Sequence, residues 1–305
     1  MALAPLVIAA SLLVDRVFGD PHTPYHPVAL LGRFIGWWGA PERYPKGLQR
    51  IAGVIFCIGT ALLFAAPFFI FERLAPWYLY LLLAPFLLKI CFAWRALEEH
   101  AGAVVAALAS GVEGGRAQVS MMVSRNTRDL GREEVLSAAY ESMTENLVDS
   151  IISPLFYFSL FGLSGAAFFR AANTMDAMLG YRDERERIGW CAARLDDLLN
   201  YLPARICGLI LLSYFAARGR FRPAWEALRR DAKKRPGFNG GIPMATIAGG
   251  VGVCLRKPGV YTLGTPERTL EEAGGDIVRA VRAATLIFSL LAMMALFLLF
   301  TLANK

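Results

Sequence analysis

The sequence predicts an all-α, polytopic integral membrane protein with about four to six membrane-inserted helices, plus amphipathic helices in cytoplasmic loops. Of its 305 residues, 56% are hydrophobic and only 19% are charged, whereas a soluble domain carries about a quarter charged residues. The apolar residues fall in long runs, which is typical of membrane spans. We expect residues 1–305 to form a single membrane domain.

The distribution of basic residues favours anionic lipid over nucleic acid as the partner of this chain. The net charge of +7 would suit a nucleic-acid-binding protein, but the basic residues lie beside the apolar runs. Cytoplasmic loops that face anionic lipid explain this arrangement better. We therefore predict contact with membrane lipid and none with nucleic acid. The five cysteines have no CxxC spacing and predict neither a zinc site nor a disulfide framework.

The N-terminal apolar run, residues 1–14, is too short for an ordinary full span, and a proline-rich segment follows it. Pro21, Pro24 and Pro27 prevent a regular helix there. Prolines that fix polar side chains at a membrane border would serve substrate binding. This segment carries Asp15, Asp20, His22, His26 and Arg33.

The clearest span covers residues 51–71, whose length of about 31 Å matches the hydrocarbon core. A turn at residues 72–76 leads into a second span that ends at Phe92. The next helix should stop near Gly111, and Gly114 with Gly115 should form a turn. Later apolar runs cover residues 151–169, 206–217 and 278–302.

Polar residues crowd both flanks of the run at 151–169. Charge at membrane depth is costly, so it indicates a functional site; solvated helix ends are the alternative. On the preceding helix, Glu141, Glu145 and Asp149 follow at intervals of four and share one face. Such a stripe attracts a cation, and Mg²⁺ with a nucleotide's phosphates would satisfy it. A solvated acidic face is the alternative here as well.

The segment at residues 218–275 is basic and rich in glycine. Backbone N–H groups of such a segment can cradle an anion, and glycines for close helix packing are an equal alternative. It has no GxxxxGK[ST] pattern, so a P-loop is not supported.

Several motifs occur in an order that resembles a known family. They are DRVFGDPHTPYHPVALLGRFI, SRNTRDL, ESMTENLVDSIISPLFY, RAANTMDAMLGYR, GWCAARLDDLLNYLPAR and GIPMATIAGGVGV. Together they resemble the adenosylcobinamide-phosphate synthase family of cobalamin biosynthesis. The similarity runs through nearly the whole chain and departs from the family pattern at FNGGIPMA, residues 238–245.

The resemblance implies a carbon–nitrogen ligase of the bacterial inner membrane, with its active site on the cytoplasmic face. It would use ATP and Mg²⁺ to join adenosylcobyric acid to (R)-1-aminopropan-2-ol or its O-phosphate. Other cobalamin-assembly enzymes and further copies of the chain are the candidate protein partners. The alternatives are a non-catalytic membrane sensor, related to the β-lactamase-regulating membrane proteins, and a transporter.

Roles are assigned from the chemistry that such a ligase needs. The candidates for magnesium are Glu141, Glu145 and Asp149. The candidates for catalysis are Asp176, Arg194, Asp196 and Asp197. The candidates for binding substrate or phosphate are Asp20, His22, His26, Arg33, Arg125, Arg128, Asn146, Asn173 and Arg205.

One conflict of topology follows from these assignments. If every apolar run crossed the membrane once, the basic loops would be cytoplasmic and residues 170–200 would lie outside, away from ATP. A re-entrant hairpin at residues 162–165 would return them to the cytoplasm, and such a hairpin is tolerated where it is buried in protein. We expect the chain to turn back there and to bring the two polar flanks into one active site.

Overall fold

The computed structural model describes residues 3–21 and 23–303 of the chain. Most of these residues are helical, and the one sheet among them is an antiparallel pair of strands, β1 and β2. The N-terminal elements are α1 (Ala4–Phe18), α2 (Pro27–Trp38), η1 (Pro41–Arg43), α3 (Gln49–Leu74) and α4 (Trp77–Lys89). The central elements are α5 (Trp94–Ala109), α6 (Val112–Ser120), α7 (Arg132–Leu147), η2 (Val148–Ile152), α8 (Ser153–Leu179) and α9 (Trp190–Leu199). The C-terminal elements are α10 (Tyr201–Ala217), α11 (Phe221–Asp231), α12 (Gly241–Val251), β1 (Cys254–Lys257), β2 (Tyr261–Gly264) and α13 (Leu270–Ala303).

Among residues 3–21 and 23–303, four helical stretches are long and apolar enough to cross a membrane, or up to five if the bent pair α9 and α10 is counted as one span. The four are Gln49–Leu74, Trp77–Ala109, Arg132–Leu179 and Leu270–Ala303. Their length and composition confirm the predicted class, an all-α polytopic membrane protein.

The chain divides into two compact units, and neither is continuous in sequence. Unit 1 comprises Met1–Ala93, Ser153–Asn200 and Ser289–Lys305, and unit 2 comprises Trp94–Ile152 and Tyr201–Phe288. The single membrane domain expected over residues 1–305 stays a prediction.

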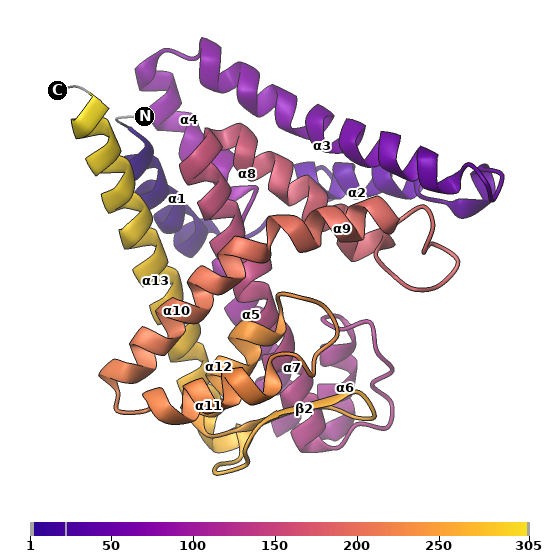
Figure 1. Cartoon of the computed structure of the whole chain (residues 1–305), viewed down its shortest axis with the longest axis vertical. Coiled ribbons are helices and arrows are strands. Elements are labelled where there is room, and N and C mark those ends of the chain that lie inside the picture. Colours follow the sequence, from indigo (N-terminus) through magenta and orange to yellow (C-terminus); the bar gives the residue numbers. More distant parts are fainter. Residues whose placement is uncertain (1–2, 22, 304–305) are drawn as a thin grey trace. The chain divides into compact units, whose positions relative to one another are not determined.

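In unit 1, the long helix α3 packs against both α8 and α9, while α2 packs on α8 and α1 packs on α4 (Figure 1). The close approach depends on Gly53 of α3, because a Cβ atom there would lie 2.2 Å from the carbonyl oxygen of Ile188. Apolar side chains around Trp38, Cys57 and Met175 form the core between these helices.

Helix α8 contains a hairpin at Gly162, where φ is 69° and ψ is −156°. The ring of Tyr157 stacks on that of Phe169 with 5.5 Å between their centroids. Twelve residues of straight helix would separate these rings by about 18 Å, so the two arms of α8 must fold back on each other. Figure 1 shows this reversal. The predicted turn in residues 162–165 is confirmed, and Glu72 of α3 sits against it.

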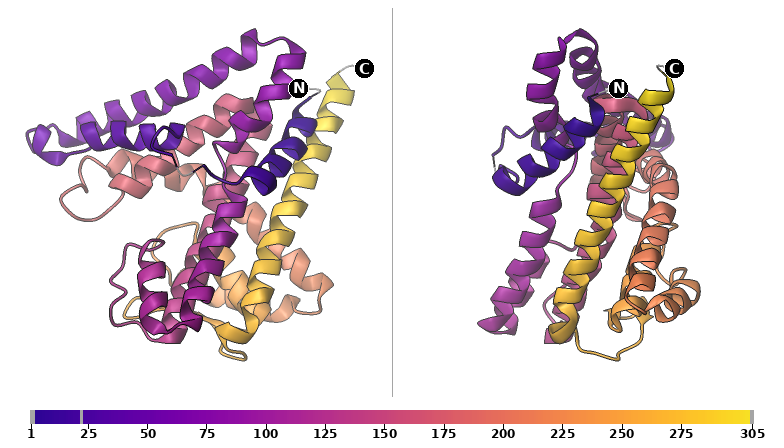
Figure 2. Two further views of the ribbon diagram at one scale, coloured as in Figure 1. Left: turned by 180° about the vertical axis from the view of Figure 1, so that it is seen from behind. Right: turned by 90° about the vertical axis from the view of Figure 1, so that its left-hand side faces the viewer.

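In unit 2, α7 packs against α5, α6 and β1, while α12 packs against α10, α11 and β2. Figure 2 shows α5, α6 and α7 running side by side. Every residue of α12 is buried except Ile242. A Cβ atom on Gly249 would lie 2.4 Å from the Ala227 Cβ of α11, and one on Gly250 would lie 2.4 Å from the Phe215 ring of α10. These two glycines therefore serve close helix packing, the second of the two interpretations left open by the sequence.

The turn expected at Gly114 and Gly115 was placed wrongly. Both residues lie inside α6, and the chain turns earlier, at Gly111, where φ is +131°. Gly115 faces α5, because a Cβ atom there would lie 2.4 Å from the Leu108 side chain. The glycine is needed for packing inside a helix, which sequence pattern alone does not distinguish from a turn.

Candidate functional site

A buried network in unit 2 surrounds Glu141 of α7, which is only 4% exposed. Arg125 donates to both carboxylate oxygens at 3.1 and 3.3 Å. The Ser137 hydroxyl donates at 2.6 Å and the Tyr261 hydroxyl at 2.7 Å. Charge-assisted hydrogen bonds of this kind are among the strongest in proteins, so Glu141 fixes the Arg125 loop and strand β2 onto α7.

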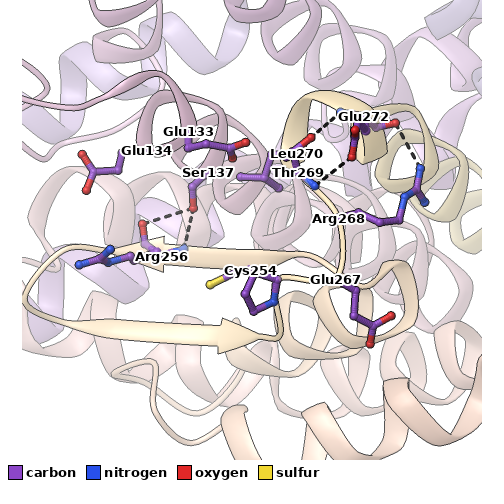
Figure 3. Close-up of a pocket in the computed structure, with 11 residues that line it drawn as sticks. Glu133, Glu134, Ser137, Cys254, Arg256, Glu267, Arg268, Thr269, Leu270 and Glu272 are labelled. Carbon is purple, nitrogen blue, oxygen red and sulfur yellow. Dashed lines mark hydrogen bonds between the residues drawn. The ribbon is translucent and has the colours of Figure 1, made fainter.

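Tyr261 and Ser137 join the β-hairpin to this network. The Arg256 N–H donates to the Ser137 hydroxyl at 2.6 Å, and Figure 3 shows these two groups meeting. Burial, and then the negative charge of Glu141, raise the pKa of Tyr261. The phenol therefore stays protonated and remains a donor to Glu141.

Glu145, one turn further along α7, is paired with Arg235. Burial alone would lower the pKa of Arg235, but the charges of Glu145 and Asp149 outweigh it and raise this pKa. The guanidinium lies against Gly240, where a Cβ atom would lie 2.9 Å from the Arg235 Cζ. Arg205 donates to the Asn239 amide oxygen at 2.6 Å, so two arginines hold the loop before α12.

The magnesium assignment of Glu141, Glu145 and Asp149 stays a prediction. Their oxygens are the donors that Mg²⁺ prefers. However, Glu141 and Glu145 each face an arginine, and no three His, Cys, Asp or Glu side chains converge on a metal position among residues 3–21 and 23–303. In this geometry the residues do not fit a metal centre, and we derive no step through Mg²⁺.

The arginine loop after α6 lines a cavity of about 490 Å³, which also contains Glu113, the ion-pair partner of Arg116. Arg125 and Arg128 meet there with Arg116, whose Nε donates to the Leu130 carbonyl at 2.8 Å. The Arg125 Nε is buried and has no hydrogen-bond acceptor in the described part of the chain. The structure therefore brings together two of the predicted phosphate ligands and adds a third arginine.

A second polar cluster, in unit 1, surrounds Asp196 of α9, which is 8% exposed. The Asn173 amide donates to one carboxylate oxygen at 3.1 Å and the Asn200 amide to the other at 2.9 Å. The Ser153 hydroxyl donates to Asn200 at 2.5 Å. Because Ser153 begins one arm of α8 and Asn173 lies on the other, the hairpin brings both arms to α9.

Two further carboxylates act on Asp196 electrostatically, Asp176 and Asp197. Asp197 lies 3.7 Å from Arg194, a loose pair in which the arginine side chain is 59% exposed and the carboxylate 34%. All four predicted catalytic residues and Asn173 thus belong to one neighbourhood of unit 1. Asn146 of unit 2 donates to the Ser142 carbonyl at 2.9 Å, along its own helix.

The proline-rich segment lines a pocket of about 590 Å³ in unit 1. Of the predicted residues, Asp20 and His26 line it, while Arg33 donates to the Pro24 carbonyl at 2.6 Å and so holds the segment itself. His22 lies outside the described residues. The chemistry of this pocket depends on two residues without an assigned role, Lys89 and Arg170.

Sequence reasoning missed several polar residues. Lys89 is the one charged residue between Trp77 and Phe92, and charge inside an apolar run is a signal that could have identified it. No comparable signal marks Ser137 or Tyr261, because their roles depend on contacts between segments distant in sequence.

Figure 3 shows another pocket of unit 2, between α7 and the start of α13, with a volume of about 440 Å³. Glu133 and Glu134 line one side, while Glu267, Arg268 and Glu272 line the other. None of the predicted site residues lies in it.

Comparisons with known proteins identify the family. Residues 8–298 match the family model described as CobD/Cbib protein. A probable cobalamin biosynthesis protein CobD of Methanothermobacter thermautotrophicus is 39% identical over 94% of this chain and 96% of its own length. The cobalamin biosynthesis protein CobD of Dehalococcoides mccartyi is 37% identical over 87% and 88%, and the probable one of Thermococcus kodakarensis is 42% identical over 92% and 90%. No solved structure matches the chain.

Proposed function

Because this chain belongs to the CobD/Cbib family of cobalamin biosynthesis, the adenosylcobinamide-phosphate synthase family, we propose that it is an ATP-dependent amide ligase. It joins the propionate carboxylate of adenosylcobyric acid to (R)-1-aminopropan-2-ol or its O-phosphate. The family match over residues 8–298 carries the proposal, because it includes all the motifs that supply the candidate residues.

The acid must be activated, since a carboxylate is a poor acyl donor at neutral pH. In the proposed reaction a carboxylate oxygen attacks the γ-phosphorus of ATP, which gives an acyl phosphate and ADP. The amine nitrogen then attacks the acyl carbon. The amide bond forms, the bond from the acyl carbon to the phosphate oxygen breaks, inorganic phosphate leaves, and a base takes the proton from nitrogen.

The arginines of unit 2 support the first step. Phosphoryl transfer depends on positioning and on charge stabilisation, and Arg125, Arg128 and Arg116 line one cavity. Arg125 is already oriented by Glu141, which accepts hydrogen bonds from both of its terminal nitrogens. A polyanion such as a triphosphate is the ligand that suits this cavity.

The carboxylates of unit 1 support the second step. Asp196 is buried and held by two amides, so it is suited to positioning. The Asp197 side chain is 34% exposed, so a substrate amine can reach it and it is the better candidate for the base. We propose that the reaction takes place at the cytoplasmic face of the cell membrane.

Product analysis with the purified, reconstituted protein tests this function. Adenosylcobyric acid, ATP and each amine are supplied, and mass spectrometry measures the amide formed while ADP is quantified. We expect an amide and an equal amount of ADP, both dependent on corrinoid and amine together. ATP use without an amide, or no reaction with either amine, would contradict the proposal.

The role of Asp197 as the base is tested by Asp197→Asn. This substitution should lower kcat by about 100-fold or more. Glu133→Gln, an exposed residue at the start of α7, is the matched control and should keep full turnover. A variant that retains wild-type turnover removes its residue from the mechanism.

A further inference from the structure

Two adjoining cavities of unit 1 lie beside the hairpin of α8, where α3 packs on it. Their volumes are about 570 and 580 Å³, and Phe69, Phe161 and Ser164 line both of them. Together these two cavities make up the hairpin groove. The first cavity is its apolar end, and the second, which contains Glu72 and Arg73, is its charged end.

The apolar end of the hairpin groove presents almost only carbon to a ligand. The Tyr157 hydroxyl donates to the Leu199 carbonyl at 2.9 Å and the Ser164 hydroxyl to the Phe161 carbonyl at 3.1 Å, so both hydroxyl protons are used within the protein. A cavity of this size and character suits hydrocarbon. Its other lining residues include Leu62, Ala65, Ala66 and Phe69 of α3 and Phe168 of α8.

The charged end of the groove contains Arg73, an exposed residue in the last turn of α3. Its guanidinium lies over the Phe69 ring, 5.1 Å from the ring centroid. Within residues 3–21 and 23–303, Arg73 has neither a hydrogen-bond acceptor nor an ion-pair partner. A cation held at the border of an apolar cavity favours an anionic ligand there.

Glu72 lines the same cavity, but its carboxylate is engaged by the hairpin. It accepts hydrogen bonds from the N–H groups of Leu163 and Ser164, and from the Tyr80 hydroxyl at 3.4 Å. Those N–H groups form the positive end of the second arm of α8, which balances a negative charge. Glu72 acts on Arg73 electrostatically, yet the two side chains form no ion pair in the described part of the chain.

The position of Arg73 on α3 matches the level of lipid headgroups. Helix α3 is one of the candidate membrane spans, and α4 begins just after the turn with Trp77 and Tyr78, both exposed. Trp and Tyr are enriched at membrane–water interfaces. Leu62, at the far end of the apolar cavity, lies about 16 Å from Arg73 along the helix axis, which is toward the hydrocarbon core.

We propose that the hairpin groove binds one anionic phospholipid, with its phosphate on Arg73 and an acyl chain in the apolar cavity. Within a membrane, a phospholipid is the ligand that joins a phosphate to hydrocarbon in this order. A headgroup with a net negative charge, such as phosphatidylglycerol, is preferred, because the phosphate of phosphatidylcholine is balanced by its own ammonium. The lipid holds α3 against the hairpin, and the proposal does not depend on the ligase function.

Native mass spectrometry of the full-length protein, released from detergent micelles, tests this site. Phosphatidylglycerol and phosphatidylcholine with the same acyl chains are added at equal concentrations. The wild-type protein should retain one phosphatidylglycerol molecule with an apparent Kd at least about fivefold lower than that for phosphatidylcholine. Phosphatidylglycerol should also raise Tm more than phosphatidylcholine does. Equal retention of the two lipids by the wild-type protein would overturn the proposal.

Arg73→Gln should abolish the preference for phosphatidylglycerol, whereas Arg73→Lys should keep most of it because the charge remains. Arg50→Gln is the matched control. Arg50 is exposed at the opposite end of α3 and also lies over an aromatic ring, 4.0 Å from the Trp190 centroid, but it lines none of the described cavities of unit 1. Equal losses in Arg50→Gln and Arg73→Gln would show general surface electrostatics and reject the site.

The acyl-chain position is tested by Ala66→Phe, which places a ring in the apolar cavity from an exposed position of α3. It should raise the apparent Kd for phosphatidylglycerol about fivefold or more. Leu63→Phe, at an exposed neighbouring position that lines none of the described cavities of unit 1, should leave this Kd unchanged. Retention that Ala66→Phe leaves unaltered, or displacement of the lipid by excess inorganic phosphate, would indicate a site for a soluble anion and overturn the proposal.

Discussion

The interaction predicted for Glu141 from the sequence differs from the one that the structure shows. In the sequence it belongs to a row of acidic residues on one helix face, which predicts a bound cation. In the structure a guanidinium supplies that positive charge, and two hydroxyls fill the remaining acceptor positions. The carboxylate thus joins α7, the segment that contains Arg125 and strand β2. We therefore expect its removal to lower the free energy of unfolding of unit 2.

Glu141→Gln should destabilise unit 2 by about 3 kcal/mol, because it leaves Arg125 without its buried counter-charge. This corresponds to a decrease in Tm of about 6–12 °C, measured by thermal unfolding in detergent. Glu133→Gln, at an exposed position of the same helix, should leave Tm within about 1 °C. A Tm unchanged by Glu141→Gln would show that the network contributes little.

Asp231 gives unit 2 a defined acid sensitivity. It is fully buried and accepts hydrogen bonds from Arg230, Lys234 and the Gly264 N–H, at 2.7 to 2.9 Å. Burial alone would raise the pKa of Asp231, but these three donors together lower it to about 2 from an ordinary 3.8. Protonation therefore favours the unfolded chain, so this stabilisation is complete above pH 4 and is lost as the pH falls from 4 through 2.

We expect the difference in Tm between wild type and Asp231→Asn to be constant above pH 5 and to shrink below about pH 4. The contribution is on the order of 1 kcal/mol, because the partner cations are half exposed and screened. Glu133→Gln, at an exposed position of α7, is the control, and its difference in Tm from the wild type should stay small at every pH. A constant difference down to pH 2 would contradict the assignment.

At the scale of elements, the hairpin of α8 depends on a single glycine. Gly162 has a positive φ, and a Cβ atom there would lie 2.2 Å from Glu72 Oε1. Glu72 accepts hydrogen bonds from the N–H groups of Leu163 and Ser164. These N–H groups begin the second arm of α8, where the helix leaves its donors unsatisfied and favours a negative charge.

Gly162→Ala should therefore lower the stability of unit 1 by about 2–4 kcal/mol, from backbone strain and displacement of the Glu72 cap. Gly59→Ala is a matched control, because a Cβ atom at Gly59 of α3 meets nothing within 4 Å. It should be neutral or stabilise by about 0.5–1 kcal/mol. Thermal unfolding of both variants measures the contrast, and equal Tm values would contradict the role of the turn.

The positions of the helices can be predicted closely from the sequence, whereas the contacts between segments distant in sequence cannot. The run at residues 51–71 became α3 with only a few residues added at each end, because hydropathy over a span is a local property. The break at Gly162 could also be predicted from its Gly-rich neighbourhood. The contacts of Lys89 with Asp15 and of Glu141 with Tyr261 could not, since they join segments that only tertiary packing brings together.

At the scale of the whole molecule, the reversal of α8 bears on the orientation in the membrane. We predict that the loop after α8 lies on the cytoplasmic side, opposite to the turn between α3 and α4. A membrane-impermeant maleimide added to intact cells should label Leu74→Cys, which is 77% exposed. It should label Glu184→Cys, an exposed position, only after the cells are opened. Labelling of Glu184→Cys in intact cells would contradict this topology.

The interleaving of the two units also constrains how the protein is made. A ribosome delivers the chain from its N-terminus, yet the last segment of unit 1, Ser289–Lys305, emerges after all of unit 2. The buried residues Ala292 and Leu296 of α13 belong to that segment. Unit 2 starts later in the sequence than unit 1, but its last residue is synthesised first. Unit 1 therefore cannot complete its folding until the C-terminal part of α13 has been made. A chain truncated after residue 288 should therefore contain a complete unit 2 and an incomplete unit 1, which limited proteolysis would detect.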